Sequence, residues 1–133
     1  MSFKTLIKYE DILCKKNLKN LVSIKSEQVF GSPFSMYTYS NEVHNFMKDV
    51  DNIIPEYPEY DLANYSNILS KNKISMIDLK PDTAWKYDLE TTLAILVCIV
   101  KSEDRCEGII EDMIRRNIIL DLLERLEDFD KQK

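Results

Sequence analysis

The stretch LETTLAILVCIVKSE, residues 89–103, decides the fold of this 133-residue chain. Its middle, from Leu93 to Val100, is a run of eight consecutive apolar residues, and Asp88 precedes the stretch as a good N-cap. A helix that is apolar on every side is buried by neighbours on several sides. We therefore predict that residues 89–103 form a central buried helix. The run is far shorter than the roughly 20 residues that span a bilayer, so we expect no membrane segment.

Directly after this run, the sequence VKSEDRCEG (residues 100–108) holds five residues that can carry charge. We interpret it as a corner between two helices, in which residues 102–104 end the first helix and cap the second. A partly buried pair of Arg105 with Glu107 would fix the angle, and Gly108 would allow a neighbouring helix to approach closely. The alternative is a groove that binds an anionic partner through Lys101, Arg105 and Glu107.

Helical periodicity continues downstream of the corner. Apolar residues at three-and-four spacing predict a helix over residues 105–116. Asn117 then suits the left-handed position that ends a helix. A last helix is predicted over residues 119–129, followed by a frayed tail over residues 130–133.

Upstream of residue 88, the apolar pattern predicts three more helices, over residues 3–16, 41–54 and 60–69. Ser40 is a good N-cap for the second of them, and Pro55 requires it to end.

The segment between the first two of these helices is different. Residues 21–39 partly alternate and are rich in aromatic residues and turn formers, so we read them as irregular or weakly extended. A short hairpin with a turn at residues 31–33 is the alternative.

These elements predict an all-α fold. Residues 1–133 would form a single compact domain of five or six helices around helix 89–103, with a short extended or hairpin segment near residues 20–38. A length of 133 residues suits one domain, and two glycines with four prolines are too few for an all-β fold.

The charge distribution disfavours nucleic-acid binding. The net charge is −5, arginine is scarce, and residues 41–133 carry −8, whereas residues 1–40 carry +3. Three cysteines at unrelated spacings form no disulfide framework, so we expect a reducing, cytoplasmic setting. The N-terminal residues MSFKTLIKYED lack the apolar region of a signal peptide. Nothing in the sequence indicates an oligomeric state.

Residues 88–126 carry a pattern that resembles an uncharacterised bacterial family, domain-of-unknown-function family 6508. The matching features are a leucine-rich helix, the basic Lys101, then Arg105 and the pair Glu107-Gly108. Cys106 replaces the family's aromatic residue, and Asn117 replaces its glycine. The segment PFSMYTYSNEVHNFM (residues 33–47) is similar to the family's aromatic turn before a helix, whereas the family's acidic-tryptophan pair is not evident. The resemblance implies a bacterial protein and a conspicuous region around the corner, but no reaction.

The sequence gives little support for catalysis or metal binding. The soft ligands His44, Cys14, Cys98 and Cys106 do not have the spacing of zinc motifs, so we expect no metal and no cofactor. The carboxylates of Glu103, Glu107 and Glu111 would stack on one helix face and could serve an enzyme with Arg105 as substrate anchor. Capping and the helix dipole explain the same residues, so an enzyme is the less favoured interpretation.

Aromatic residues in the connectors are the best binding-type feature. Tyrosine and tryptophan are favoured at interfaces because one end is apolar and the other polar. The alternative is that these rings form walls between helices. With the corner residues, the candidate binding residues are Lys101, Arg105, Glu107, Tyr39, Tyr57, Tyr60 and Trp85.

We therefore expect a small cytoplasmic protein-interaction module whose partner is a protein. One alternative is a phage or mobile-element accessory protein that inhibits a host factor by binding it through an acidic surface. The other alternative is the enzyme just described.

Overall fold

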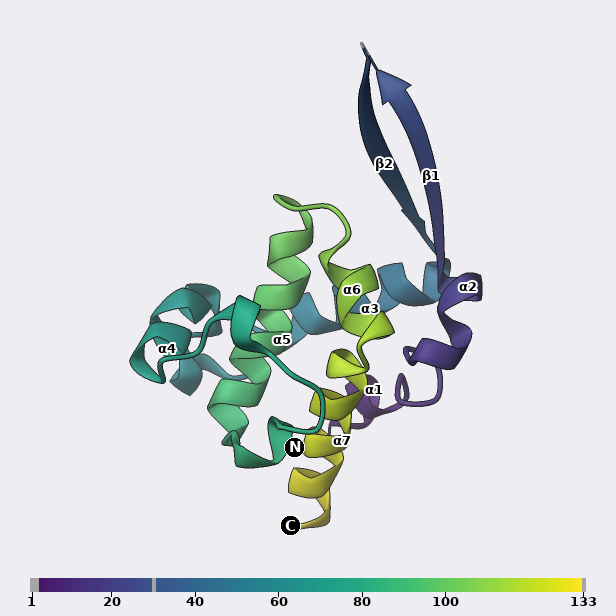
Figure 1. Ribbon diagram of the computed structural model, residues 1–133. Coiled ribbons are helices and arrows are strands. Elements are labelled where there is room, and N and C mark those ends of the chain that lie inside the picture. The colour runs from purple at the N-terminus through teal and green to yellow at the C-terminus, as the bar shows by residue number, and fades with distance from the viewer. Residues whose placement is uncertain (1–2, 30, 133) are drawn as a thin grey trace.

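The computed structural model describes residues 3–29 and 31–132, apart from the side chains of residues 27–29 and 32–35 (Figure 1). Within this range the chain is mostly helical, as predicted, with seven α-helices where five or six were predicted, and it has one antiparallel pair of strands. The α-helices are α1 (Lys4–Ile7), α2 (Leu18–Leu21), α3 (Asn41–Ile53), α4 (Tyr65–Lys71), α5 (Leu89–Glu103), α6 (Ile109–Arg115) and α7 (Ile118–Lys131). The strands are β1 (Val22–Val29) and β2 (Ser32–Tyr39). Single 3₁₀ turns are η1 (Lys15–Asn17), η2 (Pro58–Tyr60), η3 (Leu62–Asn64), η4 (Met76–Asp78) and η5 (Ala84–Lys86).

Helix α5 is the centre of the fold, with the predicted bounds. The Asp88 carboxylate accepts a hydrogen bond from the Thr91 N–H at 2.8 Å. Hydrogen bonding to the Thr91 side chain, and then to this N–H, lowers the pKa of Asp88. Every residue from Leu93 to Val100 is buried, because α3, α4, α6 and α7 all pack against α5. Figure 1 shows α5 running through the middle of the helical body. The prediction of a central helix that neighbours bury on several sides is therefore confirmed.

Residues 22–29 and 31–39 form a β-hairpin. This confirms the alternative interpretation of the segment that the sequence left open. Strands β1 and β2 pair from Val22 opposite Tyr39 to Val29 opposite Ser32. Gly31 takes a positive φ of 81° in the turn, a conformation that glycine adopts without strain. Ser32 and Pro33, predicted to lie in the turn, belong to β2. The hairpin projects away from the helical body (Figure 1).

The first predicted helix, over residues 3–16, is wrong in its length. Helix α1 ends at Ile7, and the chain continues through successive tight turns to η1. The buried residues are Phe3, Leu6, Tyr9, Leu13 and Cys14, and the first three are three apart, which suits turns of three residues better than an α-helix.

Three other helices have bounds that differ from the predicted ones. Helix α4 begins at Tyr65, because Asp61 adopts a left-handed conformation between η2 and η3. Helix α6 begins at Ile109, since Gly108 is left-handed at φ 101°. Helix α7 continues to Lys131, and the Asp130 carboxylate accepts hydrogen bonds from the Phe3 N–H, inside the region predicted as a frayed tail. Residue 133 of that tail lies outside the described residues.

Three further expectations concern Asn117, Ser40 and membrane insertion. Asn117 is left-handed at φ 56°, as predicted. Ser40 caps α3 by accepting a hydrogen bond from the Val43 N–H, also as predicted. In the described part of the chain, no helix has the length and apolar character needed to cross a membrane.

Candidate functional site

The corner between α5 and α6 is organised by Glu103, the last residue of α5. Its side chain is 8% exposed and accepts hydrogen bonds from the N–H groups of Gly108 at 2.7 Å and Ile110 at 2.8 Å. A third bond comes from the Tyr39 hydroxyl at 2.9 Å. The first N–H groups of a helix have no partner within it, so Glu103 satisfies donors at the start of α6. The cap predicted for residues 102–104 is thus made by the middle residue of the three.

The Tyr39 hydroxyl joins the hairpin to this corner. It donates to Glu103 and accepts a hydrogen bond from the Glu111 N–H at 3.4 Å. Burial and then the contact with Glu103 raise the pKa of Tyr39 well above its usual value, so the hydroxyl keeps its proton. Tyr39 therefore serves the packing of the hairpin base.

Glu107 and Gly108 hold the hairpin in a second way. The Glu107 carboxylate accepts a hydrogen bond from the Tyr37 N–H at 2.8 Å. A Cβ atom on Gly108 would lie 2.7 Å from Cζ of the Tyr37 ring. The predicted close approach at Gly108 exists, but the neighbour is strand β2 and not a helix.

The side chains of Lys101 and Arg105 contact residues of the chain other than those predicted. Lys101 forms an ion pair with Asp51 of α3 at 3.1 Å, and both side chains are well exposed. Arg105 donates to the Tyr65 hydroxyl at 3.4 Å, whereas the Glu107 carboxylate is bound to β2. The expected Arg105–Glu107 pair is therefore wrong, because the hairpin supplies a backbone donor that the sequence did not place there.

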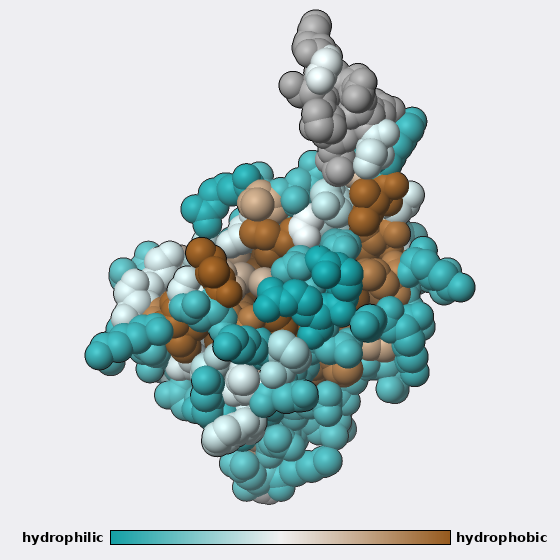
Figure 2. Space-filling view, viewed as in Figure 1, coloured by the Kyte–Doolittle hydropathy of each residue, from teal (hydrophilic) through white to brown (hydrophobic). Residues whose placement is uncertain are grey.

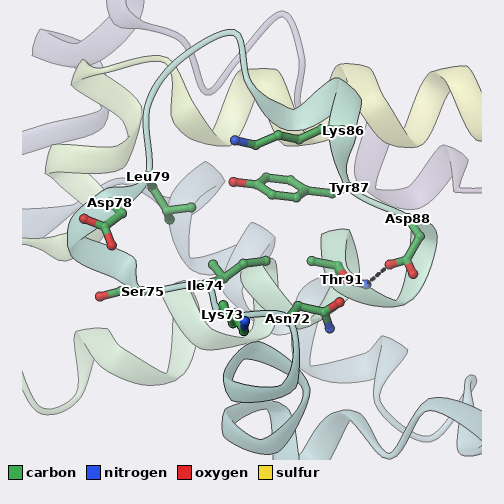
Figure 3. Close-up of a pocket in the computed structure, with 10 residues that line it drawn as sticks. All are labelled: Asn72, Lys73, Ile74, Ser75, Asp78, Leu79, Lys86, Tyr87, Asp88 and Thr91. Atoms are coloured by element: carbon green, nitrogen blue, oxygen red, sulfur yellow. Dashed lines mark hydrogen bonds between the residues drawn. The ribbon is translucent and has the colours of Figure 1, made fainter.

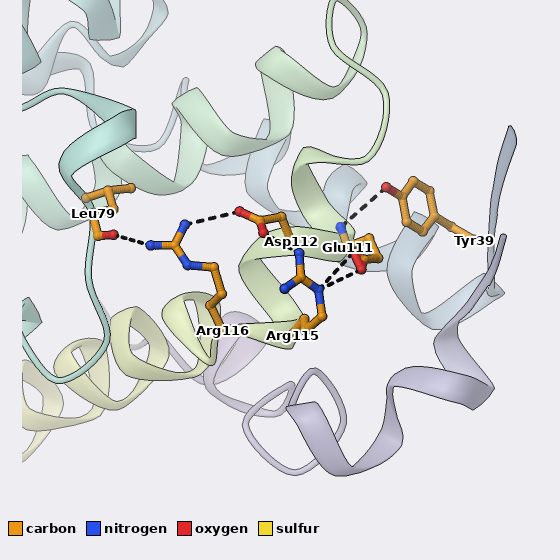
Figure 4. Close-up of polar contacts among 6 residues, drawn as sticks. All are labelled: Tyr39, Leu79, Glu111, Asp112, Arg115 and Arg116. Atoms are coloured by element: carbon orange, nitrogen blue, oxygen red, sulfur yellow. Dashed lines mark hydrogen bonds and ion pairs between the residues drawn. The ribbon is translucent and has the colours of Figure 1, made fainter. Parts of the chain in front are cut away.

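Helix α6 and the residue after it, Arg116, form a chain of ion pairs from the hairpin base toward the segment before α5 (Figure 4). Arg115 binds Glu111 at 3.0 Å and also binds Asp112, and Arg116 binds Asp112 at 3.1 Å. Arg116 also donates to the Leu79 carbonyl at 2.6 Å. These contacts connect the hairpin base, α6 and the segment before α5.

The carboxylates of Glu103, Glu107 and Glu111, which the enzyme interpretation would use, all make contacts within the fold. Glu103 caps α6, Glu107 binds a strand N–H, and Glu111 is buried against Arg115. A catalytic pair needs free carboxylates that converge on a pocket, and the present arrangement gives that interpretation no support.

The two tyrosines in the segment that follows α3 pack in or against the core. Tyr57 is buried, and its ring stacks on Phe3 with centroids 5.9 Å apart and on Tyr60 with centroids 5.8 Å apart. Burial raises the pKa of Tyr57 to about 12. Tyr60 is partly buried against the same core. The alternative reading, that these rings form walls between elements, fits both residues.

Trp85 differs from the tyrosines because it is left in solvent. It lies in residues 72–88, which we call the connector, between α4 and α5. Trp85 is 71% exposed and Ile77, in the same connector, is 90% exposed. Sequence reasoning did not single out Ile77. Its only sequence signal is that it belongs to a short apolar patch between polar turns.

The connector exposes these side chains from a backbone that is firmly held. The Asp121 carboxylate of α7 accepts hydrogen bonds from the N–H groups of Thr83 at 3.1 Å and Ala84 at 2.9 Å. Arg125 donates to the Tyr87 carbonyl at 2.9 Å, and Arg116 holds the Leu79 carbonyl as described above. Helix α7 and Arg116, the residue after α6, thus fix the connector next to Trp85.

A cavity of about 410 Å³ opens beside the connector (Figure 3). Asp78 and Lys86, the chain neighbours of Ile77 and Trp85, both belong to its lining. The Lys86 ammonium lies over the Tyr87 ring, 5.7 Å from its centroid. The full lining is Asn72, Lys73, Ile74, Ser75, Asp78, Leu79, Lys86, Tyr87, Asp88 and Thr91. The cavity therefore opens along the connector, with Ile77 and Trp85 next in the chain to two of its lining residues.

Apolar surface is also visible at the base of the hairpin (Figure 2). Ile24 and Met36 are exposed by 50% and 43%. Ile24 pairs with Tyr37 and Met36 with Lys25, so their side chains lie on opposite faces of the hairpin. They therefore form no common patch, and the connector is the better candidate surface.

Metal-ligating residues do not gather in the described part of the chain, where no group of three or more such side chains could hold an ion. His44 lies edge-on to the Tyr39 ring, with centroids 6.4 Å apart. Cys14, Cys98 and Cys106 are free thiols.

A search of known protein families, of curated proteins and of solved structures finds no match to this chain. The resemblance to domain-of-unknown-function family 6508 stays a prediction. The geometry of the chain itself must therefore carry any proposal about function.

Proposed function

We propose that this chain is a protein-interaction module that binds its partner through the connector. The observation that carries the proposal is the exposure of Trp85 and Ile77 from a backbone fixed by Asp121, Arg116 and Arg125. Tryptophan is enriched among the few residues that dominate interface energies. A backbone that is already ordered loses little further freedom on binding, which favours affinity.

The partner that suits this surface is a protein with an apolar recess for the Trp85 ring. The cavity beside the connector would receive a side chain of the partner in return. We further propose a reducing, cytoplasmic setting, supported by the three free thiols, and membership of the family that the corner resembles.

Affinity capture from cells that express the protein tests this proposal. We expect the unchanged chain to retain a partner that the variants Trp85→Ala and Ile77→Ser both lose. Arg105→Ala is the matched control, because Arg105 is exposed but belongs to the corner. A partner that both connector variants retain and Arg105→Ala loses would move the surface to the corner and contradict the proposal.

The single tryptophan provides a second readout that needs no label. Fluorescence of the free protein should be quenched efficiently by acrylamide, because Trp85 is exposed. Saturation with the captured partner should protect the ring from quenching. Unchanged quenching in the complex would place Trp85 outside the interface.

A further inference from the structure

The two edges of the hairpin are used differently near its base. The Ser40 N–H donates to the Leu21 carbonyl at 2.8 Å, so hydrogen-bonded pairs recur at every second position along the ladder from there. The pair of Ile24 and Tyr37 lies between two such positions, and its N–H and C=O groups therefore point outward. On the β2 edge, the Tyr37 N–H donates to Glu107 at 2.8 Å. On the β1 edge, the Ile24 N–H and C=O have no hydrogen-bond partner in the part of the chain that the structure describes.

A groove of about 400 Å³ lies beside this open edge of β1. Its apolar lining comes from Leu18 of α2 and from Val22 and Ile24 of β1. Val22 and Ile24 are two residues apart, so their side chains lie on the same face of the hairpin. Val22 is buried and Leu18 is partly buried, whereas Ile24 is half exposed. The groove therefore leaves apolar surface uncovered next to main-chain groups that the fold does not use.

Lysines border the same groove. Lys15 and Lys16 of η1 and Lys19 of α2 are exposed, and none of them forms an ion pair with another described residue. Glu111 is the one acidic residue in the described lining, and its carboxylate is buried against Arg115 at 3.0 Å. Lys15 and Lys16 also border the cavity beside α7, where five acidic residues outnumber three lysines. Lys19 is therefore the lysine that best tests the charge of the groove.

An open strand edge next to apolar surface and positive charge suits an extended acidic peptide, which can bind as an additional strand. We propose that the base of β1 is a docking surface for an extended segment of a partner protein, in which an apolar residue stands between acidic ones. The main chain of this segment binds the Ile24 N–H and C=O. Its apolar side chain packs on Ile24 and Leu18, and its carboxylates face the lysines.

The charge distribution and the apolar lining select this occupant. Residues 1–40 carry +3, whereas the remaining residues carry −8. Electrostatic complementarity therefore favours an acidic segment at the basic end of an acidic chain. The apolar lining favours a peptide over a phosphate backbone, which has no apolar side chain to place on Ile24. The groove shares no residue with the connector, so this proposal does not depend on the binding proposed there.

NMR titration of the full chain with the blocked peptide Glu-Thr-Val-Thr-Glu tests the docking surface. In an extended strand, its glutamates and valine lie on one face and its threonines on the other. We expect saturable shifts of the amide signals of Lys19, Val22 and Ile24. The peptide with N-methylvaline should bind about tenfold more weakly, because it lacks the main-chain donor to Ile24. The peptide Lys-Thr-Val-Thr-Lys should also bind about tenfold more weakly, because its charge is reversed.

Charge reversal at single lysines provides the matched variants. Lys19→Glu should weaken binding of the acidic peptide about tenfold and improve binding of the basic one. Lys71→Glu, at an exposed lysine in α4, is the control and should bind as the unchanged protein does. Trp85→Ala should also bind the peptide unchanged, so the failure of this surface can be told from the failure of the connector.

Several outcomes would overturn the proposal. One is the absence of saturable shifts at Val22 and Ile24, and another is equal binding of the N-methylated or the basic peptide. Shifts of these signals with protein concentration, and none with peptide, would assign the edge to a second copy of the chain. Anionic phospholipid vesicles that bind through Lys19, while the peptide does not bind, would assign the groove to a membrane surface.

Discussion

The charged corner, residues 100–108, and the connector, residues 72–88, place their most noticeable side chains in opposite ways. In the corner, the carboxylates of Glu103 and Glu107 accept hydrogen bonds from backbone N–H groups, and Glu103 also accepts one from the Tyr39 hydroxyl. In the connector, the backbone is bound by Arg116 and by α7, while the side chains of Trp85 and Ile77 are exposed to solvent. Charge at the end of α5 therefore serves the fold here, whereas the proposed partner surface depends on two apolar side chains exposed from a fixed backbone.

The largest expected effect lies in the corner. Glu103→Ala removes the acceptor of three hydrogen bonds at a buried position and leaves the Gly108 and Ile110 N–H groups unsatisfied. We expect the free energy of unfolding to fall by about 3–5 kcal/mol. Urea denaturation measures it. A loss below about 1 kcal/mol would mean that the corner does not hold the hairpin and α6 together.

Gly108→Ala should have the next largest effect. The residue would adopt φ 101° and place its Cβ against the Tyr37 ring, so we expect a loss of about 2–3 kcal/mol. The same change made in a Tyr37→Ala background should cost about 1 kcal/mol less, because the steric conflict is gone and only backbone strain remains. Equal costs in both backgrounds would show that the hairpin does not press on the corner.

Asp121→Ala tests whether the connector is held in advance of binding. It removes the acceptor for the Thr83 and Ala84 N–H groups, and we expect a loss of about 1–2 kcal/mol in unfolding free energy. Partner affinity should also weaken, although Asp121 would not touch the partner. If affinity in a calorimetric titration is unchanged, the order of the connector does not contribute to binding.

The central helix and its surroundings were predictable from sequence because their signals are local. The apolar run, the Asp88 cap and the left-handed Asn117 each depend on a few neighbouring residues, and all are found. The predicted length of the first helix was wrong because its apolar spacing was compatible with tight turns as well as with an α-helix. The hairpin could be named only as an alternative, since alternation over residues 21–39 was incomplete.

The use of the candidate site residues was not predictable, because it depends on contacts between distant parts of the chain. Tyr39 is 64 residues from Glu103, and Tyr37 is 70 residues from Glu107. The sequence placed Tyr57 and Trp85 in one class of connector aromatics, yet Tyr57 stacks in the core and Trp85 is exposed. Only the packed structure separates a ring that forms a wall from one that is free to bind.

The most direct test of this division between corner and connector is a paired measurement on Trp85→Ala and Glu107→Ala, with urea unfolding and partner titration for each. Trp85→Ala should keep its unfolding free energy within about 0.5 kcal/mol and lose partner affinity by about tenfold or more. Glu107→Ala should lose about 1 kcal/mol of stability, since the Tyr37 N–H loses its acceptor, and should keep its affinity. The reverse result, with binding lost in Glu107→Ala and retained in Trp85→Ala, would contradict the account.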